Sequence, residues 1–427
     1  MMALKSRSIL VEPSDYILRN VGDMAMLGVA IERLARLFPQ NQINVLTSDA
    51  SSLVRFAPGA TPLLDVGRAQ WLRDNFLPGV LANRLFRELR RRAPRVIGPL
   101  WRYRYRNNEN MASALDRFSW SVSNADLVVV AGMGGITDYF PGYASGVLEV
   151  LGLAIHAGRR TVMVGQGMGP LENAGLRARA AAILPKLDLI ALREQRTGRP
   201  LLTALGVDPA RIMVTGDDAI EMAYVIRPKA LDVGIGLNVR VSDYSGVDSP
   251  ILDRIREAVR DASASLGAPI IPVPISHVPG EEDIRSIGNL MASSDFELSL
   301  AAGLKTPIAV IRQIQRCRLV VTGSYHAGVF ALASGIPVVG LAKSSYYRDK
   351  FLGLADMFAV GCETVLLDHQ DCSKSLRDAI QRLYASAQAI RPHILSSAKR
   401  QIAAGHACYR RIRELASPHR VGETYDA

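Results

Sequence analysis

Residues 318–343 read RLVVTGSYHAGVFALASGIPVVGLAK and contain the repeating unit of a parallel α/β sheet. The mostly β-branched run Leu319–Val321 is typical of a buried strand, and the polar residues 322–324 interrupt it. The apolar stretch 327–333 then predicts a helix, which Gly335 ends before a second strand begins. The stretch therefore predicts strand, turn, helix and strand in that order.

His326 lies in this turn, at the carboxyl end of one predicted strand and the amino end of a predicted helix. Open α/β sheets bind ligands at this edge, and the positive end of the helix dipole favours anions there. His326 is therefore the first candidate for chemistry. The alternative is a histidine that only caps or hydrogen-bonds the start of the helix.

The same alternation of strand and helix recurs along the chain, with strands predicted at residues 8–11, 43–47, 125–130, 160–164, 187–191, 212–214, 233–239 and 270–274. This pattern predicts the α/β class, with two doubly wound, Rossmann-like domains and a central cleft. We place the N-terminal domain at residues 1–228, with an Arg-rich insertion at about 53–110, and the C-terminal domain at residues 229–427. Two helical stretches separated at Pro392 are expected to pack back on the N-terminal domain.

The composition indicates a folded protein of two or three domains, with 427 residues of which 48% are hydrophobic. No run of eighteen apolar residues is present, and the first residues lack a long apolar region, so we expect a cytoplasmic protein. The four cysteines have no CxxC spacing, which argues against a disulfide framework or a structural zinc site.

The formal net charge of +11 is unevenly distributed, because nine arginines crowd one short region: Arg84, Arg87, Arg90, Arg91, Arg92, Arg95, Arg102, Arg104 and Arg106. Such a region attracts anionic partners, and the interleaved Trp101, Tyr103 and Tyr105 suit a membrane interface or stacking on bases or sugars. We expect peripheral association with the inner face of the membrane rather than nucleic-acid binding. A non-enzymatic binding protein and a merely solvated basic surface are the alternatives.

A second candidate site follows the first predicted strand, where Asn20, Gly22 and Asp23 precede a helix predicted at Met24–Phe38. Gly22 permits close approach to the backbone, and the Asp23 carboxylate can accept a hydroxyl proton or a hydrogen bond. Alternatively, Asp23 serves only as the N-cap of the helix.

Glycine-rich turns follow two further strands, at residues 131–138 and 165–171, and Arg193 follows a third. Glycines at strand ends let a phosphate or sugar approach the backbone, and a guanidinium can clamp a carboxylate or phosphate. An ordinary ion pair is the alternative role for Arg193. Complete GxGxxG, GxxxxGK, GxSxG, HExxH and DxD motifs are absent, so neither a dinucleotide site nor a metal site is predicted.

Six segments together resemble the polysaccharide pyruvyltransferase family in order and spacing: Asn20-Val-Gly-Asp23, Gly132-Met-Gly-Gly135 with Asp138, Gly165-Gln-Gly-Met-Gly-Pro170, Leu192-Arg193-Glu194, Asp218-Ala219 and His326-Ala-Gly-Val-Phe-Ala-Leu-Ala-Ser-Gly-Ile-Pro337. The resemblance implies a two-domain, glycosyltransferase-B-like protein. It also implies transfer of pyruvate from phosphoenolpyruvate to a sugar as a ketal. The acceptor would be a lipid-linked or nucleotide-linked saccharide of a bacterial exopolysaccharide or cell-wall glycan.

The resemblance also assigns roles to individual residues, with phosphoenolpyruvate as co-substrate and no further cofactor. Catalysis falls to His326, as general acid, and to Arg193, which stabilises developing charge. Donor-binding residues are Arg193, Ser324, Tyr325, His326 and Lys343. Acceptor-binding residues are Asn20, Asp23, Gly134, Gly135, Asp138, Gln166 and Asp218. Either Asp23 or Asp218 would accept the hydroxyl proton.

One departure from the family pattern concerns the turn before the helix. Members of the family usually carry Arg-Leu-His, whereas this chain has Ser324-Tyr325-His326. The substitution removes a bidentate anchor for a carboxylate or phosphate. Either another cation, such as Lys343 or Arg348, replaces it, or the donor is different. A glycosyltransferase that uses a nucleotide sugar is therefore the alternative function.

Overall fold

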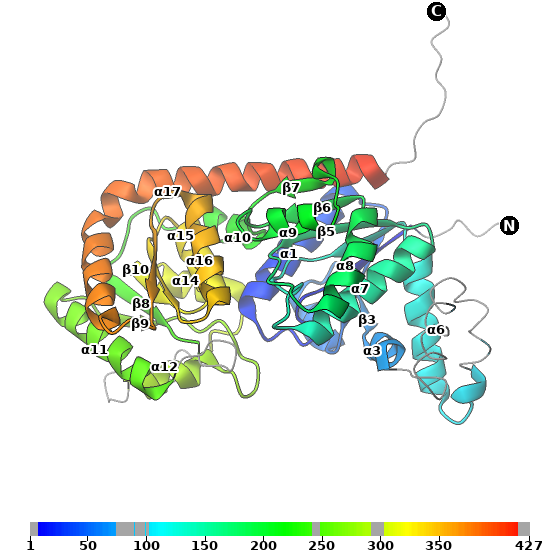
Figure 1. Cartoon of the computed structure of the whole chain (residues 1–427), viewed down its shortest axis with the longest axis horizontal. Coiled ribbons are helices and arrows are strands. Elements are labelled where there is room, and N and C mark those ends of the chain that lie inside the picture. Colours follow the sequence, from blue (N-terminus) through cyan, green and yellow to red (C-terminus); the bar gives the residue numbers. More distant parts are fainter. Residues whose placement is uncertain are drawn as a thin grey trace, which may run out of the picture.

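The computed structural model describes residues 7–73, 89, 99, 102–240, 248–291 and 303–416. Two sheets lie beside each other along the long axis of the molecule, and helices cover both (Figure 1). Every strand pair within either sheet is parallel. The prediction of two doubly wound α/β units is confirmed.

The first sheet has seven strands in the order β3-β2-β1-β4-β5-β6-β7. Their bounds are β1 Ser8–Glu12, β2 Gln42–Thr47, β3 Thr61–Leu64, β4 Leu127–Val130, β5 Arg160–Gln166, β6 Leu189–Leu192 and β7 Ile212–Val214. The order reverses between the neighbours β1 and β4. The carboxyl ends of these two strands therefore border the crevice in which doubly wound sheets bind ligands.

The second sheet has five strands in the order β12-β11-β10-β8-β9. Their bounds are β8 Gly234–Asn238, β9 Ile270–Pro272, β10 Cys317–Thr322, β11 Val338–Ala342 and β12 Cys362–Leu366. Here the order reverses between β8 and β10. The turn that contains His326 follows β10 and therefore lies at the corresponding crevice of this sheet.

The helices of the first unit are α1 Val21–Leu37, α2 Ala50–Phe56, α3 Val66–Arg73, α6 Glu109–Asn124, α7 Pro141–His156, α8 Ala174–Ile183, α9 Gly198–Ala204 and α10 Ala219–Val225. Those that follow are α11 Ser249–Leu266, α12 Asp283–Met291, α14 Pro307–Ile314, α15 Tyr325–Ala333, α16 Ser345–Phe358 and α17 Cys372–Ala416. Short 3₁₀ helices cover Leu184–Lys186 and Pro209–Arg211.

Strand residues alternate between two apolar layers, as expected for sheets covered on both faces. In β1, Ile9 and Val11 belong to one core and Leu10 to another. The first of these cores continues into the second unit, where it includes Val320 of β10 and Phe330 of α15. One apolar core therefore joins the two units beneath the crevice.

The start of α1 differs from the prediction in a way that matters for the site. Asn20 is the N-cap, and its side-chain oxygen accepts hydrogen bonds from the backbone N–H groups of Gly22 and Asp23, at 3.0 and 3.3 Å. The helix therefore begins three residues earlier than predicted. Because Asn20 provides the cap, the Asp23 carboxylate is not needed for it.

The segment 53–110, expected to be an irregular insertion, contributes regular structure at its start, with β3 at the sheet edge and α3 after it. Six of the nine crowded arginines, namely Arg84, Arg87, Arg90, Arg91, Arg92 and Arg95, lie outside the described residues, as does Trp101. Among those described, Arg102 pairs with Asp116, and the Arg106 guanidinium lies 4.6 Å from the Tyr103 ring centre.

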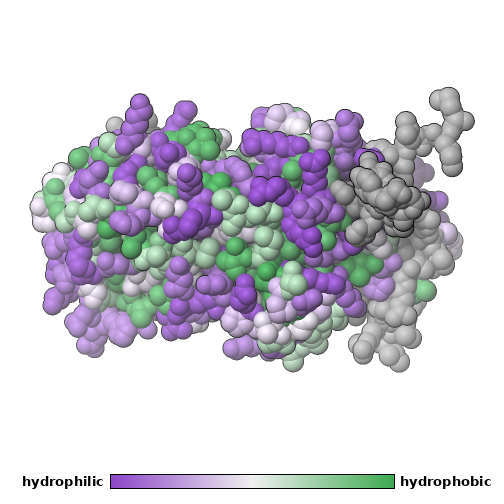
Figure 2. Space-filling view, turned by 90° about the horizontal axis from the view of Figure 1, so that it is seen from above, coloured by the Kyte–Doolittle hydropathy of each residue, from purple (hydrophilic) through white to green (hydrophobic). Residues whose placement is uncertain are grey.

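The C-terminal segment forms one helix, α17, rather than two stretches separated at Pro392. The helix bends and then extends across both units (Figure 1). Beside Pro392, the Arg391 guanidinium donates hydrogen bonds to the carbonyls of Ser334 and Gly335, which hold the helix against the end of α15. Seen from the side of α17, hydrophilic residues are interspersed with hydrophobic ones (Figure 2), and the helix buries apolar residues such as Leu376, Ile380 and Ile412.

Candidate active site

A small cavity, which we call the cationic pocket, lies between the two sheets and has a volume of about 90 Å³. Both units contribute to its lining: Asn20, Asp23, Met133, Gly134, Phe140, Arg193, Arg240, Ser324, Tyr325, His326, Tyr346, Tyr347 and Lys350. Most of these residues follow strands at the two places where strand order reverses. The fold therefore brings together the predicted residues Asn20, Asp23, Gly134, Arg193, Ser324, Tyr325 and His326.

His326 is the second residue of α15 and is 8% exposed. Its Nε2 lies 3.1 Å from Met26 Sδ and 3.7 Å from Asp217 Oδ2. A Cβ atom at Gly22 would lie within 2.4 Å of three His326 side-chain atoms, so only glycine fits there. The glycine expected to admit a ligand instead admits the imidazole ring from the other unit.

Arg193 follows β6 and is 3% exposed, with its guanidinium 3.9 Å from the ring centre of Tyr325. Its NH1 lies 3.7 Å from Asp217 Oδ2. Within the described part of the chain, neither Arg193 Nε nor Asp217 Oδ2 has a hydrogen-bond partner, although both are buried. Buried polar atoms are normally hydrogen-bonded, so these two mark a place where a polar ligand or water belongs.

The glycine-rich turns make room for this guanidinium. A Cβ atom at Gly134 would lie 2.8 Å from Arg193 NH2, and one at Gly167 would lie 2.8 Å from Arg193 Nε. These glycines therefore border Arg193 directly. Of the turn residues assigned to acceptor binding, only Gly134 lines the cationic pocket.

Lys350, from α16, completes the cationic wall and was not predicted. Its Nζ lies 3.8 Å from the ring centre of Tyr346, whose hydroxyl donates a 3.0 Å hydrogen bond across the cleft to the carbonyl of Gly134. Burial and the nearby Arg193 hold the pKa of Lys350 well below its usual value. The same causes, burial first and then Arg193 and Lys350, hold the pKa of His326 well below its usual value. These surroundings favour the uncharged form of the imidazole.

The pKa values of two carboxyl groups beside these basic residues are raised instead of lowered. Burial and the neighbouring Asp15 raise the pKa of Asp23 to about 7, although Arg193 partly offsets the shift. Burial raises the pKa of Asp217 to about 6. A carboxyl group with a pKa near neutrality, such as that of Asp23, is suited to giving and taking a proton.

Asp217 and Asp218 have different surroundings although they are adjacent in the chain. Asp218, assigned to acceptor binding by the sequence, pairs with Arg33 at 2.6 Å and accepts a 3.0 Å hydrogen bond from the Tyr409 hydroxyl of α17. It lines neither the cationic pocket nor the cavity beside it. Asp217, which sequence reasoning missed, faces Arg193 and His326 instead.

Four other predicted site residues lie away from the cationic pocket. The Gln166 amide donates to backbone carbonyls, including Val164 at 2.9 Å, and Asp138 accepts hydrogen bonds from the backbone of Asn173. Gly135 packs against the Tyr143 ring. Lys343 pairs with Asp248 at 2.9 Å and lines a different cavity. Each of these four residues therefore makes its contact within the protein, away from the cationic pocket.

A larger cavity, the open pocket, adjoins the cationic pocket and has a volume of about 380 Å³. Its lining is mostly polar and includes four carboxylates, Asp15, Asp23, Asp65 and Glu281. Asn20, Asp23 and Arg240 line both cavities. Asp23 therefore stands where the contents of the two pockets would meet.

Sequence reasoning missed Asp217, Arg240 and Lys350, although the first two carry a signal. Asp217 follows β7 and Arg240 follows β8, so both lie at strand carboxyl ends, where ligand-binding residues are expected. Lys350 lies inside α16, where no local pattern distinguishes it from a surface lysine.

The described residues hold neither a cluster of metal ligands nor a membrane-spanning helix. No group of three or more His, Cys, Asp or Glu side chains in these ranges is arranged to hold a metal ion. In the same ranges, none of the helices combines the length and apolar content needed to span a bilayer.

The chain matches the sequence model of the polysaccharide pyruvyl transferase family over residues 20–345. The match includes every predicted site residue, from Asn20 to Lys343. No curated protein matches the sequence.

Solved structures with a similar fold share little sequence with this chain. A putative UDP-N-acetylglucosamine 2-epimerase from Listeria monocytogenes is 14% identical, with 96% of this chain and 95% of that one covered and a TM-score of 0.54. Alr3699/HepE from Anabaena, in complex with UDP and glucose, is 12% identical, with 96% and 100% covered and a TM-score of 0.51. A glycosyltransferase from Rickettsia africae is 11% identical, with 97% and 99% covered and a TM-score of 0.51. These similarities confirm the glycosyltransferase-B-like fold.

Proposed function

Because the chain belongs to the polysaccharide pyruvyl transferase family, we propose that it transfers the pyruvyl group of phosphoenolpyruvate to two hydroxyls of a saccharide, forming a ketal. The observation that carries the proposal is the convergence of Arg193, Arg240, Lys350 and His326 on one small pocket beside Asp23. Phosphoenolpyruvate carries a carboxylate and a phosphate on a three-carbon unit. A small pocket lined by basic side chains suits such an anion.

The donor binds in the cationic pocket in this proposal. Arg193 offers a guanidinium with an unpaired buried Nε among the described residues, which suits a carboxylate or phosphate oxygen. The surroundings of His326 favour its uncharged form, so its imidazole orients the donor by hydrogen bonding instead of by charge. The saccharide binds in the open pocket, whose larger volume and polar lining suit hydroxyl groups.

Asp23 acts as proton donor in place of His326. The protonated Asp23 carboxyl transfers its proton to the methylene carbon of the donor, which becomes a methyl group, and the adjacent carbon becomes electrophilic. A saccharide hydroxyl attacks that carbon and returns its proton to the Asp23 carboxylate. The carbon–oxygen bond to phosphate then breaks, a second hydroxyl attacks, and its proton leaves with phosphate. The protons balance without any external acid.

We assign the general acid to Asp23, and not to His326 as the family resemblance implied, for an electrostatic reason. The surrounding cations and burial disfavour the imidazolium that a histidine acid requires. Burial and Asp15 favour the protonated form of Asp23. Arg193 is positioned to stabilise the leaving phosphate by charge, and Lys350 can donate a hydrogen bond to it in either protonation state.

A coupled assay tests the proposed function directly. The purified chain is incubated with phosphoenolpyruvate and a panel of lipid-linked and nucleotide-linked saccharides, and phosphate release is measured. Release that depends on both donor and acceptor supports the proposal. If phosphoenolpyruvate neither raises the melting temperature nor is consumed, while a nucleoside diphosphate stabilises the folded protein, the nucleotide-sugar alternative replaces it.

We extend the proposal to peripheral association with an anionic membrane, motivated by the arginines between Arg84 and Arg106. A lipid-linked acceptor would place the enzyme at the bilayer surface, where basic residues are attracted to acidic headgroups. Replacing Arg90, Arg91 and Arg92 with Ala should reduce co-sedimentation with anionic vesicles while turnover of a soluble acceptor is retained. If co-sedimentation is unchanged, these arginines do not bind the membrane and this part of the proposal is wrong.

A further inference from the structure

The turn after β10 has a close neighbour at the end of β8. The two strands are paired, with Thr322 in register with Asn238, so the residues that follow them emerge side by side. A Cβ atom at Gly323 would lie 3.2 Å from the backbone nitrogen of Arg240 and 3.6 Å from its Cβ. The Arg240 side chain therefore starts beside the residue that precedes Ser324, and both Arg240 and Ser324 line the cationic pocket.

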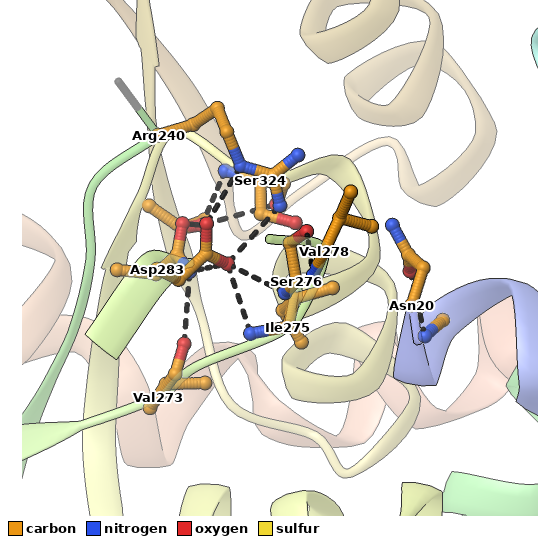
Figure 3. A network of polar contacts seen from close by, with 11 residues as sticks. Asn20, Arg240, Val273, Ile275, Ser276, Val278, Asp283 and Ser324 are labelled. Atoms are coloured by element: carbon orange, nitrogen blue, oxygen red, sulfur yellow. Dashed lines mark hydrogen bonds and ion pairs between the residues drawn. The ribbon is translucent and has the colours of Figure 1, made fainter. Parts of the chain in front are cut away.

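A buried network holds the Arg240 guanidinium in one orientation (Figure 3). Its Nε donates to Asp283 Oδ1 at 2.6 Å, and its NH2 donates to Asp283 Oδ2 at 3.1 Å. Asp283 is completely buried and also accepts from the Asn238 amide and from the backbone N–H groups of Ile275 and Ser276. A carboxylate held by this many donors fixes the plane of the guanidinium.

Neither cation suggested by the sequence reaches the same place. Lys343 is paired with Asp248, and Arg348 is an exposed residue beside Asp349, 3.4 Å away. Neither residue lines the cationic pocket. Arg193 and Lys350 line the pocket from other elements, which leaves Arg240 as the cation next to Ser324 in the described part of the chain.

We propose that Arg240 supplies the guanidinium that anchors the anionic donor beside the turn, in place of an arginine at position 324. The inference rests on the proposed function, because it assigns a further ligand to the donor in that site. Arg240 and Arg193 approach the pocket from different sheets, so a donor with a carboxylate and a phosphate meets one guanidinium from each. Asp283 is then a positioning residue, which orients Arg240 without touching the donor.

The test moves the guanidinium from position 240 to position 324. Removing Arg240 alone would leave Asp283 as an unpaired buried charge and would destabilise the fold, so the pair is neutralised together as Arg240→Gln with Asp283→Asn. Phosphoenolpyruvate affinity is measured by calorimetry without acceptor, after circular dichroism has shown that the variant is folded. We expect affinity to fall about 10- to 100-fold, because a hydrogen bond to a charged group is lost. Adding Ser324→Arg to this variant should recover about tenfold or more.

The matched control is another buried ion pair, Arg68 with Glu12, which is equally enclosed but does not line the cationic pocket. The variant with Arg68→Gln and Glu12→Gln should bind phosphoenolpyruvate as the natural sequence does. If the Arg240/Asp283 variant also binds it unchanged, Arg240 is not a donor ligand, although the proposed function stands. If affinity falls and adding Ser324→Arg does not restore it, Arg240 does not take the place of an arginine at position 324. If the natural sequence binds no phosphoenolpyruvate, the proposed function itself fails.

Discussion

The cationic pocket and the open pocket share Asn20, Asp23 and Arg240 but differ in size and charge. The cationic pocket has about 90 Å³ and is lined by the basic residues Arg193, Lys350 and Arg240. The open pocket has about 380 Å³ and is lined mainly by polar and acidic side chains. An anion is therefore favoured in the first and a hydroxyl-rich molecule in the second.

This difference gives Asp23 its properties. The carboxyl group stands at the boundary, with Asp15 on one side and Arg193 on the other, and the net effect of burial and these charges raises its pKa to about 7. Neither pocket alone provides such a group. The contrast between the pockets thus assigns donor and acceptor to separate places, with proton transfer at the boundary between them.

The largest effect is expected for Asp23→Asn, which tests whether Asp23 is the proton donor at the boundary between the two pockets. The amide keeps the shape of the side chain but cannot donate a proton to the methylene carbon, so kcat should fall about 10²- to 10⁴-fold. Phosphoenolpyruvate affinity, measured by calorimetry, should change little. If kcat is retained while the variant is folded, Asp23 is not the proton donor.

Removing Arg193 should weaken the cationic pocket specifically. In Arg193→Gln we expect phosphoenolpyruvate affinity to fall about 10- to 100-fold, because charged hydrogen bonds to the donor are lost. Arg196→Gln is the matched control, since Arg196 pairs with Asp356 and lies outside both pockets. Equal affinities in the two variants would contradict the assignment of the donor to this pocket.

The dependence of kcat on pH tests whether the protonated form of Asp23 is the active one. Only the protonated form of Asp23 can donate, and the protonated fraction falls as the pH rises above its pKa of about 7. A bound anionic donor would raise this pKa further, so the midpoint should lie at or above 7. The rate should then fall by about tenfold per pH unit on the alkaline side. A rate that increases steadily from pH 6 to 9 would contradict the mechanism.

The smallest effect is expected in the open pocket, at Asp65. This carboxylate accepts a hydrogen bond from the Ser48 hydroxyl and is exposed to the open pocket. Asp65→Asn should raise the KM of the saccharide about 2- to 10-fold, as expected for one hydrogen bond, without changing phosphoenolpyruvate affinity. An effect on donor affinity alone would show that the two pockets are wrongly assigned.

The sequence predicted those parts of the site that depend on local pattern. Arg193 and His326 each follow an apolar strand run, and strand ends meet at one edge of a parallel sheet, so their approach to the same cleft could be foreseen. The close packing of Gly22 against His326 could not, because the two residues are 304 positions apart in the chain.

The adjacent residues Asp217 and Asp218 show why other parts of the site could not be predicted. Asp217 and Asp218 both follow β7, and nothing local indicates which one faces the cleft. Arg33 of α1 and Tyr409 of α17 decide the outcome by binding Asp218. At the start of α1 the prediction failed in a similar way, because Asn20 and Asp23 are both good N-caps and only the backbone geometry distinguishes them.

The most direct test of the account is the reaction in D₂O with phosphoenolpyruvate and a saccharide that supports phosphate release. If Asp23 exchanges with solvent and protonates the methylene carbon, the methyl group of the ketal product should carry one deuterium, and the product mass should increase accordingly. Mass spectrometry of the purified product measures this. A ketal with no deuterium in its methyl group would contradict the proposed proton transfer, and a glycoside formed from a nucleotide sugar, with phosphoenolpyruvate left intact, would contradict the proposed function.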